Sequence, residues 1–191
     1  MENFESKGAP LNNQDGADTG EKELRIFLIG FMGCGKTYWG QKLAQKLELP
    51  FFDLDHQIEE GEEKTITKIF EGEGEEHFRR LEKEALHLIT ESHGAFVMAT
   101  GGGTPCFYNN IEYMKKSGLV IWINCSTTDL HQRLLQEKET RPLLKELSDD
   151  QLLAYITKKG ADRNIFYRQA NITVSGEGLS LEKLISKIVH I

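Results

Sequence analysis

The chain has 191 residues, enough for one domain with its own hydrophobic core, and its net charge at pH 7 is −7. This acidity argues against a general nucleic-acid binder, because no surplus of basic side chains is available to neutralise phosphates. The sequence has no apolar run of membrane-spanning length, no apolar secretory segment and no CxxC pair among its three cysteines, so we expect a cytoplasmic protein with reduced thiols and no membrane contact.

Residues 1–22 are polar, and we expect a disordered tail there, followed by a single domain over residues 23–191. Short apolar segments predict strands at Leu24–Ile29, Phe51–Leu54, Ala95–Ala99, Leu119–Asn124 and Ile172–Val174. Apolar residues at helical spacing predict helices at Thr37–Leu47, Asp55–Glu60, Thr65–Phe70, Glu75–Ser92, Asn109–Lys116, Thr128–Gln136, Asp149–Gln169 and Leu181–Val189. Almost wholly apolar strands that alternate with helices indicate a parallel sheet covered on both faces, a three-layer α/β/α fold.

The segment GFMGCGKT, from Gly30 to Thr37, lies between the first predicted strand and the first predicted helix. A glycine loop in this place turns backbone N–H groups toward a polyphosphate, and the helix N-terminus adds the positive end of its dipole. Lys36 would reach the β- and γ-phosphates, and Thr37 would offer its hydroxyl to Mg²⁺. Tyr38 stands where a second small hydroxyl is common, so it supplies only a backbone N–H. We expect the residues that bind ATP here to be Gly33, Cys34, Gly35, Lys36, Thr37 and Tyr38.

Two carboxylates, Asp53 and Asp55, stand at the end of the second predicted strand. In an extended segment, side chains two residues apart point the same way, and two carboxylates repel unless a cation or a hydroxyl separates them. A magnesium site beside a hydroxyl acceptor fits this pair. In an alternative interpretation, Asp55 caps a helix that starts at His56, and the two roles are compatible.

Two further segments indicate an anionic ligand. Arg79 lies within the first turns of the long helix, where the macrodipole disfavours a cation, so a bound anion would explain it. The alternative for Arg79 is a simple salt bridge to Glu75. The triple glycine Gly101–Gly103 follows the third strand directly and lets the backbone approach a ligand closely, although a plain tight turn is the alternative.

A polar segment of about residues 137–148 contains Arg141 in front of Pro142, and we expect a lid there. Such a lid would bring Arg141 to the phosphates during transfer, whereas the alternative is a solvated loop. Arg163 and Arg168 flank Tyr167 on the last long helix, and periodicity alone does not decide which arginine faces inward.

Together these segments resemble the shikimate kinase family, from about Leu24 to Val174. The matching motifs are GFMGCGKT, FFDLDxxIE from Phe51, GEEHFRRLE from Gly74, TGGG from Thr100, TRPLL from Thr140 and DRNIFYRQA from Asp162. The resemblance implies a five-stranded parallel sheet in the order 2-3-1-4-5, as in nucleoside monophosphate kinases. It also implies transfer of the ATP γ-phosphate to the 3-hydroxyl of shikimate, on the route to chorismate and the aromatic amino acids.

The resemblance assigns the substrate-binding side to four positions. Asp55 would bind the acceptor hydroxyl and act as its base, and Arg79 and Arg163 would bind the substrate carboxylate. Gly102 would contact shikimate through its backbone. The proline that usually follows the substrate arginine is missing after Arg163, so this assignment depends on the spacing to Tyr167.

The resemblance also assigns the phosphate side. Lys36 and Arg141 would contact ATP and, with Asp55, form the catalytic set. Thr37 and Asp53 would organise the shell of Mg²⁺, the expected cofactor. Paired guanidinium groups explain how an acidic protein binds an anionic acid.

Two alternative functions remain at this stage. Another small-metabolite kinase of the same fold, such as a gluconate kinase, shares the phosphate loop, but Asp55, Arg79 and Arg163 favour a hydroxylated carboxylic acid. A non-catalytic nucleotide-binding homologue is the other alternative. We expect shikimate and ATP as the ligands, no nucleic-acid partner, and a monomer, because no long apolar surface stripe requires a second subunit.

Overall fold

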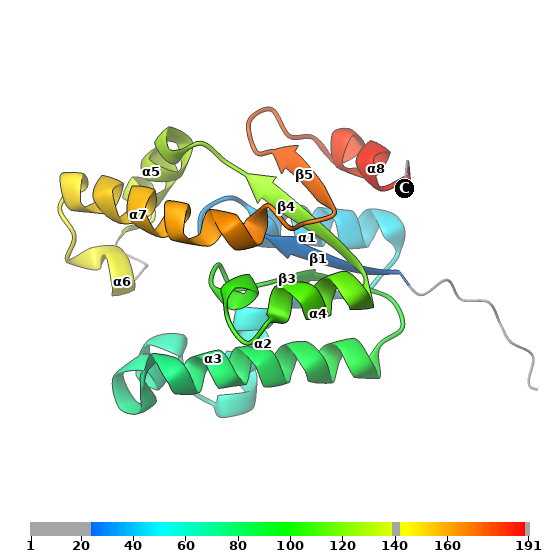
Figure 1. The fold of residues 1–191 in the computed structure, drawn as a ribbon, viewed down its shortest axis with the longest axis horizontal. Coiled ribbons are helices and arrows are strands. Elements are labelled where there is room, and N and C mark those ends of the chain that lie inside the picture. Colours follow the sequence, from blue (N-terminus) through cyan, green and yellow to red (C-terminus); the bar gives the residue numbers. More distant parts are fainter. Residues whose placement is uncertain (1–23, 139–141, 190–191) are drawn as a thin grey trace, which may run out of the picture.

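One parallel sheet forms the centre of the part of the chain that the computed structural model describes, residues 24–138 and 142–189 (Figure 1). Its strands are β1 (Arg25–Ile29), β2 (Phe51–Asp53), β3 (Phe96–Ala99), β4 (Leu119–Asn124) and β5 (Ile172–Ser175). They lie in the order β2-β3-β1-β4-β5, and every neighbouring pair is parallel. The predicted fold class and strand order are therefore confirmed.

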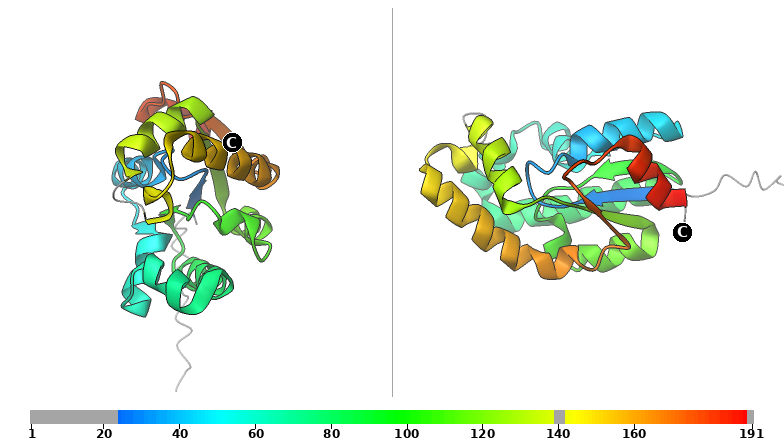
Figure 2. Two further views of the ribbon diagram at one scale, coloured as in Figure 1. Left: turned by 90° about the vertical axis from the view of Figure 1, so that its left-hand side faces the viewer. Right: turned by 90° about the horizontal axis from the view of Figure 1, so that it is seen from above.

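Helices cover both faces of this sheet, as Figure 2 shows from two directions. They are α1 (Lys36–Leu47), α2 (Leu54–Glu62), α3 (Ile66–Ser92), α4 (Asn110–Ser117), α5 (Thr127–Gln136), α6 (Pro142–Lys145), α7 (Asp149–Tyr167) and α8 (Leu181–Val189), with a 3₁₀ turn η1 (Thr104–Cys106). The alternating side chains of β1 explain the layers, because Ile26 and Leu28 pack on one face and Phe27 and Ile29 on the other. The first face is covered by α1 and α8, and the second by α3 and α4.

The structure corrects several predicted boundaries. β2 ends at Asp53, so Asp55 lies in the first turn of α2 and neither continues the strand nor caps a helix starting at His56. The predicted helices Thr65–Phe70 and Glu75–Ser92 correspond to the two parts of α3, which are separated by a kink at the non-helical residue Gly74. The short helix α6 was not predicted, because its segment shows no apolar periodicity.

The carboxyl ends of the strands lie at one edge of the sheet, and α5, α6 and the start of α7 lie beyond that edge (Figures 1 and 2). The segments that follow β1, β2 and β3 contain the phosphate-loop, paired-aspartate and triple-glycine motifs. Open parallel sheets bind their ligands at this edge. Within the described residues, no helix is both long and apolar enough to cross a membrane.

Candidate active site

The loop between β1 and α1 encloses the side chain of Lys36. Its Nζ atom donates hydrogen bonds to the carbonyl oxygens of Gly30 at 2.9 Å and of Phe31 at 3.0 Å, and the residue is buried. A cavity of about 270 Å³ adjoins this loop, and its lining residues include Gly33, Gly35, Lys36, Thr37, Tyr38, Asp53 and Asp55. The predicted phosphate-binding residues thus surround a cavity, apart from Cys34, whose side chain is buried in the core.

Thr37 and Asp53 form an oxygen-rich pair beside Lys36. The Thr37 hydroxyl donates a 2.6 Å hydrogen bond to Asp53 Oδ2, although the two residues belong to different elements. A hydroxyl and a carboxylate oxygen are suitable ligands for Mg²⁺, which is usually held by one or two carboxylates together with waters and substrate phosphates. The described residues contain no group of three or more His, Cys, Asp or Glu side chains that could hold a metal by themselves. The residues present therefore fit a partial magnesium shell that phosphates complete.

A second cavity, of about 330 Å³, lies next to the first. Its lining residues include Asp55, Phe70, Phe78, Arg79, Gly101, Gly102, Gly103 and Arg163. Both cavities are lined by Met32, Asp55 and Gly102, so they meet at these residues. The structure therefore brings together Asp55, Arg79, Gly102 and Arg163, the predicted substrate-binding set, directly beside the phosphate loop.

Asp55 lies at the junction of the two cavities and is held in an unusual environment. Its Oδ1 atom is buried and has no hydrogen-bond partner among the described residues. Burial raises the pKa of this carboxyl to about 7, with further increases from the negative charges of Glu82 and Asp53 and opposing decreases from Lys36 and Arg79. A carboxyl group with a pKa near neutrality is suited to accept a proton from a substrate hydroxyl.

Arg79 is buried against aromatic rings and acidic side chains. Its guanidinium pairs with Glu82 at 2.5 Å and with Glu75 at 3.0 Å, and lies 4.5 Å from the centre of the Phe107 ring. Burial lowers the pKa of Arg79, but the charges and hydrogen bonds of Glu82 and Glu75 outweigh this effect and raise the pKa overall. The predicted salt bridge to Glu75 exists together with a place in the cavity, so the two interpretations of Arg79 do not exclude each other.

Glu82 is the functional neighbour that sequence reasoning missed. Only 1% of its side chain is exposed, and besides binding Arg79 it accepts a 2.5 Å hydrogen bond from the Thr104 hydroxyl. The side-chain amide of Asn110 in turn donates to the Thr104 carbonyl at 3.0 Å. The i, i+3 spacing of Arg79 and Glu82 was a visible signal for their pairing.

The triple glycine follows β3, and two of its members have no room for a side chain. A Cβ atom on Gly101 would clash with Glu82 Oε1 and lie 2.8 Å from Asp55 Oδ1. A Cβ atom on Gly103 would lie 2.6 Å from Arg79 Nη1. The glycines therefore let the carboxylates and the arginine approach the backbone, which favours the ligand-site interpretation over a plain turn.

Arg163 projects from α7 toward the same cavity. Its guanidinium lies 5.4 Å from the centre of the Phe31 ring, and its Nη1 atom is buried without a hydrogen-bond partner among the described residues. The hydroxyl of Tyr167, one turn further along α7, donates a 2.5 Å hydrogen bond to the Gly102 carbonyl. A buried donor with no partner is suited to an anionic ligand.

Arg141, predicted to act on the phosphates from a lid at residues 137–148, lies outside the described residues. Within that segment the structure describes the short helix α6. Arg133, on α5, donates a 3.2 Å hydrogen bond to the Gly33 carbonyl, so this arginine contacts the phosphate loop.

Comparisons with known proteins show what the chain is similar to. A family model described as shikimate kinase matches residues 32–191. The chain is 41% identical over 165 residues to a shikimate kinase of Azobacteroides pseudotrichonymphae, covering 86% of this chain and 97% of that protein. It is 45% identical over 148 residues to a shikimate kinase of Bacteroides fragilis, covering 78% and 82%.

Solved structures give the same result. The shikimate kinase of Bacteroides thetaiotaomicron is 38% identical, with a TM-score of 0.82 over 88% of this chain and 99% of that one. The Acinetobacter baumannii shikimate kinase, solved with shikimate, is 35% identical, with a TM-score of 0.76 over 90% and 93%. By sequence and by structure, this chain belongs to the shikimate kinase family.

Proposed function

We propose that this chain is an ATP-dependent kinase that transfers the γ-phosphate of ATP to the 3-hydroxyl of shikimate, giving shikimate 3-phosphate and ADP. The reaction belongs to the route to chorismate and the aromatic amino acids. The single observation that supports this function best is the meeting of two cavities at Asp55 and Gly102, one beside the phosphate loop and one with two arginines. Phosphoryl transfer requires such placement of donor and acceptor side by side.

Asp55 is the proposed base. Its unpartnered Oδ1 atom is available to accept a hydrogen bond from the substrate hydroxyl, and its pKa of about 7 makes the carboxylate a competent proton acceptor near neutral pH. The hydroxyl that it orients would lie between the phosphate loop and the arginine cavity, because Asp55 lines both.

Arg79 and Arg163 are the proposed carboxylate ligands, with the backbone of Gly102 beside them. Arg79 is held by Glu82 and Glu75 in a fixed orientation, whereas the Nη1 atom of Arg163 keeps an unused donor. This arrangement favours a hydroxylated carboxylic acid, and a neutral sugar would leave the Nη1 donor of Arg163 without an anionic partner.

Lys36 and the backbone of the loop from Gly33 to Tyr38 are proposed to bind the ATP phosphates. Arg141 is proposed to add further positive charge at the same phosphates. We propose that Thr37 and Asp53 hold Mg²⁺, which would neutralise charge on the transferring phosphate. The protein is proposed to work as a cytoplasmic monomer, which suits its free cysteines.

The direct test is a coupled assay of ADP release. Purified protein with Mg·ATP is mixed with shikimate, with gluconate or with no acceptor. We expect ADP release that depends on shikimate and far exceeds both controls. Absence of shikimate-dependent release would contradict the proposal, and release with gluconate alone would favour the other small-metabolite kinase.

A further inference from the structure

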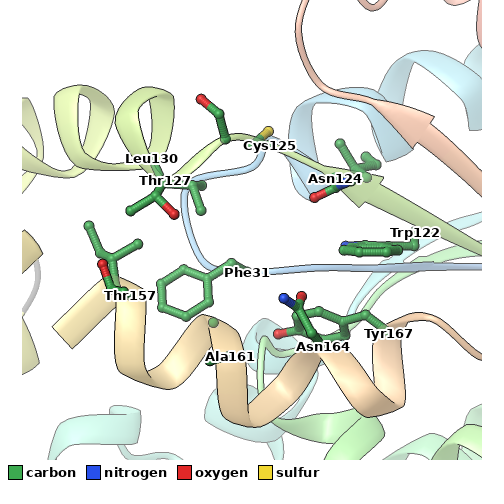
Figure 3. A pocket seen from close by; sticks show the side chains of 14 residues that line it. Phe31, Trp122, Asn124, Cys125, Thr127, Leu130, Thr157, Ala161, Asn164 and Tyr167 are labelled. Carbon is green, nitrogen blue, oxygen red and sulfur yellow. The ribbon is translucent and has the colours of Figure 1, made fainter. Parts of the chain in front are cut away.

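A third cavity, of about 280 Å³, shares no lining residue with the arginine cavity or with the cavity at the phosphate loop, and has no role in the reaction described above. It lies between the carboxyl end of β4, the start of α5 and one face of α7 (Figure 3). None of the residues proposed to bind ATP, shikimate or Mg²⁺ lines it. We propose that this cavity is a second small-molecule site, which binds an uncharged planar ligand with an amide-like edge.

The absence of charged side chains among the lining residues favours an uncharged ligand. All fourteen residues around the cavity have neutral side chains, in contrast to the arginines and carboxylates of the substrate cavity. A charged ligand would lose part of its hydration here without gaining an ion-pair partner, which is costly. The volume lies just below the range of about 300–1,000 Å³ typical of small-molecule sites.

Aromatic rings give the cavity its preference for a planar ligand. Phe31, Trp122 and Tyr167 contribute to the lining, and the Trp122 and Tyr167 rings lie 5.8 Å apart at an angle of 37°. Only 8% of Trp122 is exposed, so its indole forms an inner wall. Aromatic faces and edges of this kind bind flat rings by stacking or edge contact.

Two amides indicate the polar edge of the ligand. Asn124, at the end of β4, and Asn164, on α7, approach the cavity from opposite sides (Figure 3). Neither side-chain amide makes a hydrogen bond to another described residue. Each amide offers both a donor and an acceptor, so a ligand with the same pair of groups satisfies them.

The place of the cavity in the fold supports a ligand site. β1 and β4 are neighbours in the sheet, and the chain that leaves β1 next enters β2 on the far side of β1 from β4, whereas the chain that leaves β4 next enters β5 on the far side of β4 from β1. The crevice between the carboxyl ends of two such neighbouring strands is a preferred binding position in open α/β sheets. Phe31 follows β1, and Trp122 and Asn124 belong to β4, so the cavity occupies this crevice.

Two residues that line this cavity also contact residues of the proposed shikimate site. The ring of Phe31 faces the cavity and contacts Arg163, and Tyr167 lines the cavity while its hydroxyl binds the Gly102 carbonyl. A ligand that fixes Phe31 and Tyr167 therefore also acts on two groups proposed to bind shikimate. We expect the affinities of the two sites to be coupled, and to equal extents in both directions.

The test uses benzamide, a planar ring with one neutral amide, and its isosteres benzoate and benzamidinium. The chain has two tryptophans, and only Trp122 lines the cavity, so its indole N–H signal in a ¹H–¹⁵N NMR spectrum reports occupancy, with Trp39 as internal control. We expect benzamide to shift the Trp122 signal saturably, in the presence of saturating shikimate as well. Neither charged isostere should do so.

Gly160 supplies matched variants, because it lines the cavity and a Cβ atom there would contact nothing within 4 Å. Gly160→Leu should fill the cavity and abolish the benzamide shift. Gly160→Ala should keep the shift, and both variants should fold, because each replaces a mid-helix glycine with a better helix former. A missing shift in the wild type, an equal shift by all three probes, a shift retained in Gly160→Leu or displacement by shikimate would overturn the second site.

The coupling has its own measurement, which does not depend on catalysis. Calorimetric titration of shikimate, with and without saturating benzamide, should give Kd values that differ by about fivefold or more. The difference should persist in Gly160→Ala and disappear in Gly160→Leu. An unchanged Kd in the wild type would overturn the coupling. Because these are binding measurements, a failed kinase assay would leave the benzamide result unaffected.

Discussion

The carboxyl group of Asp55 is surrounded by features that oppose its charge. Burial, Glu82 and Asp53 all raise its pKa, and the resulting value of about 7 exceeds the ordinary value of 3.8. The same environment that makes Asp55 a better base thus makes its ionised form unfavourable in the folded chain. This conflict at a single residue leads to predictions for both activity and stability.

For activity, we expect kcat/KM for shikimate to fall about tenfold per pH unit below pH 7, because only the ionised carboxyl accepts a proton. The measurement is a pH profile of initial rates at low shikimate concentration. Asp55→Asn should lose transfer over the whole range. A wild-type profile that stays flat down to pH 5 would remove Asp55 from the role of base.

For stability, we expect Asp55→Asn to be more stable than the wild type at pH 8 by about 2–4 kcal/mol. At pH 8 the Asp55 carboxyl of the folded wild type is ionised and buried. Between pH 7 and pH 4 this carboxyl is protonated in the folded protein but still ionised in the unfolded chain. The gain should therefore be constant above pH 7 and shrink toward zero at pH 4. Thermal unfolding of both proteins across this range measures it, and a gain that grows at low pH would contradict the raised pKa.

Glu82 is proposed as a positioning residue that acts through Arg79, and the exposed Glu75 provides its control. The Glu82 side chain is 1% exposed and the Glu75 side chain 58% exposed, although both pair with Arg79. Glu82→Gln should destabilise the fold by about 3 kcal/mol and raise KM for shikimate, because a buried pair is broken. Glu75→Gln should cost less than about 1 kcal/mol, since exposed pairs contribute little.

A second readout separates positioning from a merely structural role for Glu82. Because the charge of Glu82 raises the pKa of Asp55, Glu82→Gln should also move the pH profile of kcat/KM to lower pH. Equal effects of the Glu82 and Glu75 variants on stability, KM and pH profile would contradict the role given to Glu82.

At the scale of elements, α3 changes direction at Gly74, directly before the turns that hold Arg79. Gly74 has φ 82° and ψ 172°, a conformation that side chains with a Cβ atom essentially do not adopt. Gly74→Ala should therefore destabilise the protein by about 1–3 kcal/mol, although no atom lies within 4 Å of the added methyl group.

Gly72 supplies the matched control for Gly74. It belongs to the same helix, also has open space around its Cα atom, and does not have a positive φ. Gly72→Ala should raise stability by about 0.5–1 kcal/mol, because alanine favours the helix. Thermal unfolding of the two variants should thus give shifts of opposite sign, and stabilisation by Gly74→Ala would contradict the strained backbone.

The same elements show how far the sequence predicts structure. β1 and β4 were found almost to the residue, because both are buried on two faces and their apolar runs are unbroken. Asp55 was misplaced relative to β2, because this strand has only three residues and the following helix starts at Leu54. Local pattern contains little information about such short elements.

Some residues of the site were likewise predicted from the sequence, and others were not. The residues of the loop, the paired aspartates and the triple glycine were predicted, because each motif requires particular residue types at fixed spacing. The role of Glu82 and the unpartnered oxygen of Asp55 were not predicted, because they depend on burial by segments distant in the sequence. Thr104, which binds Glu82, lies 22 residues further along the chain.

At the scale of the whole molecule, the order of the strands accounts for the proximity of the two proposed substrates. β1 lies beside β3 at the centre of the sheet, so the phosphate loop after β1 adjoins the triple glycine after β3. α7 then crosses this edge and brings Arg163 and Tyr167 to Gly102. The cavity proposed for ATP and the cavity proposed for shikimate thus bind different ligands, but Asp55 and Gly102 line both of them.

This separation predicts that each ligand stabilises the protein independently. A ligand at one hundred times its Kd stabilises the folded state by about 2.7 kcal/mol, which is roughly 5–10 °C in Tm for a chain of this size. Arg163→Ala should lose the Tm shift caused by shikimate and keep the shift caused by Mg·ADP, since of these two cavities Arg163 lines the acceptor cavity. Lys36→Met should show the reverse, because of the same two cavities Lys36 lines the one at the phosphate loop. If either variant lost both shifts while its fold remained intact by circular dichroism, the two cavities would not be separate subsites, and the assignment of donor and acceptor to them would be wrong.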